Sequence, residues 1–154
     1  MGAALERRLK QQPLKDPVSE GILNLLVTAA VLNEQFDALF GQFGLTSSAF
    51  NVLRILRGKP EGQPRGEIAR RMVNRAPDIT RLIDGLARRG LVRRVRGRAD
   101  RRLSVTLITP KGAALLARIE PAYADYQRNL AATLSVAEWQ QLSRLCERIY
   151  EEKQ

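Results

Sequence analysis

The sequence predicts a mainly α-helical protein with one small β-hairpin, and three observations carry this prediction. Over most of the 154 residues, apolar side chains recur at intervals of three and four, the period of an amphipathic helix. Two short segments between residues 91 and 107 instead resemble a pair of strands, the second with a clear period of two. Prolines, glycines and Ser, Thr or Asp residues lie between the periodic segments, where helices begin and end.

The charge of the protein is concentrated in one quarter of the chain. Residues 65–102 contain thirteen arginines and four acidic residues, a net charge of +9 out of +10 for the whole protein. Arginine gathered in this way indicates a phosphate-rich partner, and the pI near 10.8 restricts that partner to a nucleic acid or an anionic membrane.

Composition also excludes several classes of protein. One cysteine and no histidine leave no disulfide framework and no common zinc site, so no metal or other cofactor is expected. The first residues lack the apolar run of a signal peptide. Because no run of about 18 uninterrupted apolar residues occurs, no membrane span is expected. We therefore expect a cytoplasmic protein.

Residues 1–44 are predicted to form an N-terminal arm and one long helix. The arm contains a short helix within residues 3–12, before Pro13. Asp16 and Pro17 form a typical helix start, and Gly44 a typical end, about 27 residues and ~40 Å later. One apolar seam of this helix comprises Ile22, Leu25, Ala29, Leu32, Phe36, Leu39 and Phe43. A second apolar face runs beside it, which favours a dimerisation helix over the alternative, a plain core helix.

Residues 45–109 are predicted to form helix, loop, helix, turn, helix and hairpin. Thr46 caps the first helix, and the Gly- and Pro-rich segment 58–64 is expected to be a loop. A short helix over 66–72 follows, and then a helix within 74–90 with Pro77 in its first turn. The exposed face of that helix carries Asp78, Thr80, Arg81, Asp84 and Arg88. Strands over 91–95 and 103–107 enclose an arginine-rich tip.

Residues 110–154 are predicted to form two further helices that contribute to dimerisation. Thr109 and Pro110 start the first of them, which Pro121 should kink or divide. Residues 135–138 form a capping box that starts the last helix. The predicted dimerisation residues are Ile22, Leu25 and Leu32 of the long N-terminal helix and Trp139, Leu142, Leu145 and Ile149 of the last helix.

The arginine-rich module matches what DNA recognition requires. A recognition helix needs an apolar back and a polar front, and residues 74–90 offer both. A hairpin that enters the minor groove needs a slim tip with arginines, which Gly97 and its neighbours supply. The alternative, a solvated arginine-rich turn, is less consistent with a helix pair directly upstream.

These residues resemble the multiple antibiotic resistance regulator (MarR) family. The run DITRLIDGLARRGLVRR resembles that family's recognition helix and first wing strand, and ADRRLSVTLITPKG its wing tip, second strand and next helix. The match runs from about residue 20 to the end of the chain. It implies a winged helix-turn-helix domain flanked by long dimerisation helices in a homodimeric transcriptional regulator, most often a repressor. Arg65 and Gly66 depart from the pattern, because many members have a Ser or Thr helix cap there.

The resemblance also implies roles for individual residues. Pro77, Asp78, Thr80 and Arg81 would face the major groove, and Arg101 or Arg102 would enter the minor groove. Asp100 would position the wing arginines, which include Arg96 and Arg98. Family members often bind small aromatic acids, so an aromatic or phenolic effector is expected. Its pocket residues would be Phe36, Phe40, Phe50 and Arg54, although an aromatic stripe on a long helix more often belongs to a core or an interface.

Three other interpretations were compared with a site-specific regulator. An enzyme is disfavoured because residues 65–109 contain no histidine, no cysteine and no paired carboxylates. An architectural DNA-binding protein without effector control is the main alternative. A membrane-surface role is less consistent, since the arginines lie on turns and a hairpin rather than along one helix face.

Cys146 in the last helix is expected to be a packed structural residue rather than a redox switch.

Overall fold

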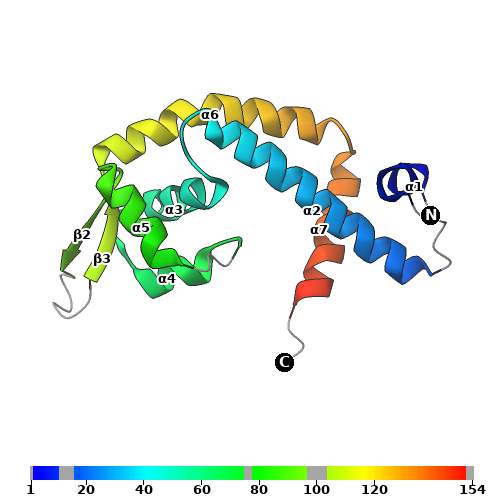
Figure 1. Ribbon diagram of the computed structural model, residues 1–154, viewed down its shortest axis with the longest axis horizontal. Helices are drawn as coiled ribbons and strands as arrows, with labels where there is room; N and C mark the ends of the chain where they lie inside the picture. The colour runs from blue at the N-terminus through cyan, green and yellow to red at the C-terminus, as the bar shows by residue number, and fades with distance from the viewer. Residues whose placement is uncertain (1, 11–15, 75–77, 97–103, 152–154) are drawn as a thin grey trace.

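The computed structural model describes residues 2–10, 16–74, 78–96 and 104–151, and it confirms the mainly helical fold class. Helices α3, α4 and α5 and a small sheet gather at one end of the molecule, while α2 and α6 run away from them (Figure 1). The elements are α1 (Ala3–Leu9), α2 (Pro17–Gly41), α3 (Ser47–Arg57), β1 (Gln63–Pro64), α4 (Arg65–Arg71), α5 (Ile79–Arg88), β2 (Val92–Arg96), β3 (Ser104–Ile108), α6 (Pro110–Ala131) and α7 (Val136–Tyr150).

The predicted helix starts are confirmed by their capping hydrogen bonds. Asp16 accepts from the backbone N–H groups of Val18 and Ser19, and Thr46 accepts from that of Ala49. Thr109 caps α6 through the N–H of Gly112, and Ser135 forms the predicted capping box with Glu138. Each cap satisfies a donor that the first turn of a helix would otherwise leave without a partner.

The sheet contains one strand more than the predicted hairpin. β2 and β3 pair antiparallel, and β1 adds to the other edge of β3, with Gln63 opposite Thr106 and Pro64 opposite Val105. The expectation that all of 58–64 is a loop was therefore wrong. Proline is tolerated because β1 is an edge strand, where a missing N–H donor can face away from the ladder.

Helix α3 forms the centre of the hydrophobic core. Its Val52, Leu53 and Leu56 are completely inaccessible to solvent. Fully buried side chains from α4, α5 and α6 complete the centre of this core: Ile68, Ile83 and Ile119. The helix pair that carries the arginines is thus packed on the same core as α6, which leads away from it.

The end of α2 and the start of α5 differ from the predictions. Helix α2 ends at Gly41, and Gly44, with φ +68°, closes the turn that follows. Helix α5 begins at Ile79 with Asp78 as its cap, so Pro77 precedes the helix instead of lying in its first turn, and it falls outside the described residues. Pro121 does not divide α6, which runs without interruption and bends near its middle (Figure 1).

Among the described residues, α2 is the one helix long and apolar enough to span a membrane by length and composition alone. The core helix of a protein can meet the same criteria. The C-terminal part of α2 packs inside the protein, where Phe40 is only 2% exposed and its ring lies 3.9 Å from that of Phe50. We conclude that α2 is not a membrane span.

Candidate nucleic-acid interface and its adjoining cavity

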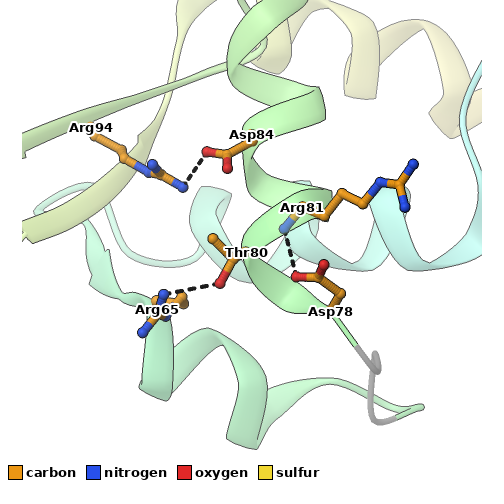
Figure 2. A network of polar contacts seen from close by, with 6 residues as sticks. All are labelled: Arg65, Asp78, Thr80, Arg81, Asp84 and Arg94. Atoms are coloured by element: carbon orange, nitrogen blue, oxygen red, sulfur yellow. Dashed lines mark hydrogen bonds and ion pairs between the residues drawn. The ribbon is translucent and has the colours of Figure 1, made fainter.

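Helix α5 has the buried back and polar front that a recognition helix needs. Ile83 and Leu86 are 0% and 2% exposed and seat the helix on the core. Asp78 caps the helix by accepting from the Arg81 N–H at 2.9 Å, and the Asp78 and Arg81 side chains are exposed. The predicted base-facing Asp78 therefore has a structural task at the helix start, while the Arg81 guanidinium extends away from the neighbouring polar contacts (Figure 2).

Two polar contacts fix α5 relative to its neighbours (Figure 2). Arg65, the first residue of α4, donates from Nη1 to Thr80 Oγ1 at 2.9 Å. Arg94 on β2 forms an ion pair with Asp84 on α5, with 2.5 Å between Nη2 and Oδ1. Sequence analysis placed Asp84 on the exposed face and noted Arg65 as a departure from the family pattern, but it paired neither. Because each contact joins two different elements, no pattern within a few residues predicts it.

The wing is described only at its base. Arg96, the last residue of β2, lies opposite Ser104 in the backbone ladder. The predicted tip residues Arg98, Asp100, Arg101 and Arg102 lie outside the described residues. The antiparallel strands β2 and β3 lie at the same end of the molecule as α5 (Figure 1).

The start of α4 has no capping side chain, and the sequence likewise has Arg65 and Gly66 where a Ser or Thr cap was expected. Its cap position is Pro64, which makes no side-chain capping bond. Arg65 then occupies the first helical position and bonds Thr80. The Arg65 side chain thus connects the two helices of the helix-turn-helix pair.

A cavity of about 140 Å³ lies beside this pair, between α2, α3, α6 and the turn after α4. All four predicted effector residues line it: Phe36, Phe40, Phe50 and Arg54. The other lining residues are Asn33, Ser47, Ser48, Asn51, Met72, Val73, Asn74 and Tyr123. Sequence analysis missed these, since they come from four separate segments.

The cavity combines aromatic walls with a single kind of charge. Phe40 stacks on Phe50, and Tyr123 lies 5.4 Å from the Phe50 ring centre. Among the described lining residues only Arg54 is charged, and its guanidinium carbon lies 5.8 Å from the Phe50 ring centre and 5.7 Å from that of Tyr123. Such a site favours an aromatic ring that carries a negative charge.

Two polar contacts near the cavity fix the helices that surround it. Asp37 on α2 accepts from the Ser47 hydroxyl at 2.6 Å and from the Ser47 N–H at 3.2 Å, and these bonds lower the pKa of Asp37. The Tyr126 hydroxyl donates to Gln35 at 2.9 Å, and burial, together with the nearby Tyr123, raises the pKa of Tyr126. Tyr126 is therefore neutral at ordinary pH.

The predicted dimerisation residues lie on helices with little cover from the rest of the chain. Ile22 is 52% exposed, Leu145 45% and Ile149 67%, and no residue of α7 is buried. Leu25, Leu32, Trp139 and Leu142 are partly exposed. Cys146 is a free, partly exposed thiol on the same helix.

Comparison with known proteins identifies the family. Residues 43–103 match the family model described as the MarR family. A MarR transcription factor from Planctomyces limnophilus is 37% identical, with a TM-score of 0.64, over 88% of this chain and 98% of that chain. The chain belongs to the MarR family.

Further relatives of this MarR-family chain are regulators of transcription. The HTH-type transcriptional regulator PapX of Escherichia coli is 27% identical over 87% of this chain and 85% of PapX. The transcriptional repressor CouR, solved bound to a 23-mer DNA duplex, is 29% identical with a TM-score of 0.74 over 90% of this chain and 99% of CouR. The predicted winged helix-turn-helix fold and DNA-binding class are thereby confirmed, and regulators of this family are not enzymes.

Proposed function

We propose that this MarR-family regulator is a cytoplasmic homodimer that represses transcription from a pseudo-palindromic operator and is released by a small aromatic or phenolic anion. The observation that carries the proposal is the placement of Arg81. The Arg81 side chain is exposed on one face of α5, and the opposite face of this helix is buried. The Asp84–Arg94 ion pair fixes the orientation of α5 relative to strand β2 of the wing.

Dimerisation is supported by the surface that a single chain leaves uncovered. The chain exposes 11333 Å², whereas a compact monomer of 17.3 kDa exposes about 7,800 Å². Part of the excess is apolar: Val18, Leu26 and Tyr150 are 68%, 61% and 71% exposed. We therefore assign residues 1–44 and 110–154 to dimerisation and 45–109 to DNA binding.

The proposed contacts divide into base reading and positioning. Arg81 would read a base edge in the major groove, with Pro77, Asp78 and Thr80 beside it. The wing arginines Arg96, Arg98, Arg101 and Arg102 would follow the minor groove, with Asp100 positioning them. A two-fold dimer places the two α5 helices about one helical turn of DNA apart.

We expect Arg81→Ala to weaken operator binding roughly 5- to 150-fold and to relax base choice at one position in each half-site, because a bidentate arginine–guanine contact is lost. Binding to operator and to random DNA would be measured by fluorescence anisotropy at ~150 mM salt and over a salt series. Arg144→Ala on α7 removes the same charge far from α5 and should leave the base preference unchanged.

The same measurement tests the proposed function itself. Contacts to ~6–10 phosphates give a steep salt dependence, with a log–log slope near −0.9 for each phosphate. Equal affinity of the wild-type protein for operator and random DNA would instead support the architectural alternative.

The effector proposal is supported by the size and chemistry of the cavity. A cavity of about 140 Å³ is close in size to the engineered apolar cavity of ~150 Å³ that accommodates benzene. Arg54 would bind the acidic group of the ligand, while the phenylalanines and Tyr123 would contact its ring.

We expect an aromatic carboxylate to raise the melting temperature and to weaken operator binding roughly five- to 150-fold, the usual range of allosteric coupling. Arg54→Gln should weaken binding of the carboxylate ~10- to 100-fold, because a charge-assisted bond is lost, and should affect a neutral phenol less. A panel of aromatic carboxylates and phenols, followed by thermal shift and anisotropy, would show this. A compound that stabilises the protein without changing operator affinity would contradict control through this cavity.

A further inference from the structure

One hydrogen bond connects the wall of the cavity to the turn of the helix-turn-helix. The Val73 backbone N–H donates to Asn51 Oδ1 at 3.0 Å. Asn51 lies on α3, next to the completely buried Val52, so its backbone is anchored by the core. Val73 and Asn74 follow α4 directly and lead toward the cap of α5. All three residues line the cavity.

Apolar packing holds α4 up to Met72 but does not extend to the residue after it. The Met72 side chain is 8% exposed, whereas that of Val73 is 85% exposed. The position of the turn at Val73 therefore depends on its polar contact with Asn51. Asn51 is held by the buried core beside it, whereas Val73 has little packing of its own. The hydrogen bond between them is therefore sensitive to a ligand in the cavity.

The amide of Asn51 also lies within reach of a ligand. Asn51 and Arg54 are three residues apart on α3, and positions so spaced share one face of a helix. Both line the same cavity. An aromatic ring seated against Phe40 and Phe50 with its carboxylate at Arg54 would bring a strong hydrogen-bond acceptor to the Asn51 side chain.

We propose that Asn51 is a positioning residue that couples the cavity to DNA binding. In the free protein its carbonyl oxygen accepts from the Val73 N–H and so holds the residue after Met72 against α3. An aromatic carboxylate in the cavity accepts from the Asn51 Nδ2–H and rotates the amide, so that Oδ1 leaves the Val73 N–H and Val73 is released. This inference rests on the proposed operator binding, and it adds the residue through which the effector acts.

The test compares Asn51→Ala with Asn51→Asp, and Asn129→Ala serves as a matched control that removes the same amide from an exposed position on α6, outside the cavity lining. Operator affinity would be measured by anisotropy, and exchange of the Val73 amide by NMR on the DNA-free dimer, with and without saturating benzoate. Melting temperature and sedimentation would verify the fold and assembly of each variant.

We expect Asn51→Ala to weaken operator binding roughly three- to tenfold for each protomer, the usual net contribution of one hydrogen bond, and to speed exchange at Val73 by a similar factor. Asn51→Asp should restore both values, since a carboxylate accepts from the same N–H. It should also lose the response to benzoate, because the added negative charge repels the anion. Asn129→Ala should bind operator as the wild type does.

Three results would overturn the inference: wild-type operator affinity in Asn51→Ala, no rescue by Asn51→Asp, or no acceleration of Val73 exchange by benzoate in the wild-type protein. Asn51→Asp retains a hydrogen-bond acceptor, so it remains informative even if Asn51→Ala fails to fold. Failure of the proposed function is distinguishable, because it appears in the wild-type protein as equal affinity for operator and random DNA, whereas the exchange of Val73 requires no DNA.

Discussion

Replacing Ile22 and Leu26 with glutamate is expected to convert the proposed dimer into folded monomers that bind operator roughly 100-fold or more weakly. The two residues lie four positions apart on one face of α2 and are 52% and 61% exposed in the single chain. A monomer would tolerate charges there, whereas a dimer interface would have to bury them without partners at a cost of several kcal/mol each. Loss of the second half-site then removes the gain from bivalent binding, which is about 10²–10⁴-fold.

Sedimentation velocity, circular dichroism and anisotropy would measure assembly, fold and DNA affinity of this variant. Lys59→Glu is the matched control, because it makes the same change of charge on the turn after α3. The Lys59 ammonium lies 3.8 Å from the Glu61 carboxylate, and both side chains are well exposed. An Ile22→Glu, Leu26→Glu protein that remains dimeric would show that α2 does not form the interface.

Gly112→Ala is expected to lower the free energy of unfolding by about 3 kcal/mol, near the upper end of the usual cost of overpacking. Gly112 lies in the first turn of α6, where the helix meets the end of the α5–β2 connection. A Cβ atom there would lie 2.2 Å from the backbone oxygen of Leu91 and 2.9 Å from Ile108 Cγ1. Backbone cannot yield as a flexible side chain can, so the junction between α6 and the sheet must move.

Urea unfolding would measure the loss, with Gly85→Ala as the control. Gly85 lies inside α5, and no heavy atom would lie within 4 Å of an added Cβ. Its replacement should raise the free energy of unfolding by up to about 1 kcal/mol, since alanine favours a helix. Similar stability of the two variants would show that the close approach at Gly112 is not maintained in solution. Because Thr109 and Gly112 join the sheet to α6, a strained junction should also weaken operator binding.

The sequence predicted correctly those features whose signals are local. Helix caps depend on a side chain and a backbone group two or three residues away, and Asp16, Thr46, Thr109 and Ser135 all cap as expected. The hairpin strands were placed to within one residue, because alternation with period two is itself local. The concentration of arginine in 65–102 needed no structure at all.

Other features depend on segments that only folding brings together. β1 was missed because a two-residue strand has no pattern of its own and exists only through its pairing with β3, some forty residues later. Pro77 was expected in the first turn of α5. The Asp78 side chain caps the helix instead, so α5 begins at Ile79, after Pro77. Pro121 was expected to kink or divide α6: the helix bends near its middle, and packing on the core keeps it in one piece.

By itself, then, the sequence determined the helices, their caps, the hairpin and the family, because side-chain chemistry and periodicity act over a few residues. It also selected the four residues Phe36, Phe40, Phe50 and Arg54 that meet at the cavity. Only the tertiary structure decided that the turn residues Val73 and Asn74 close the same cavity, that Asn51 bonds Val73, and that Asp84 pairs with Arg94. The physical reason is that these contacts join different elements, and the packing of α3 against its neighbours sets their distances.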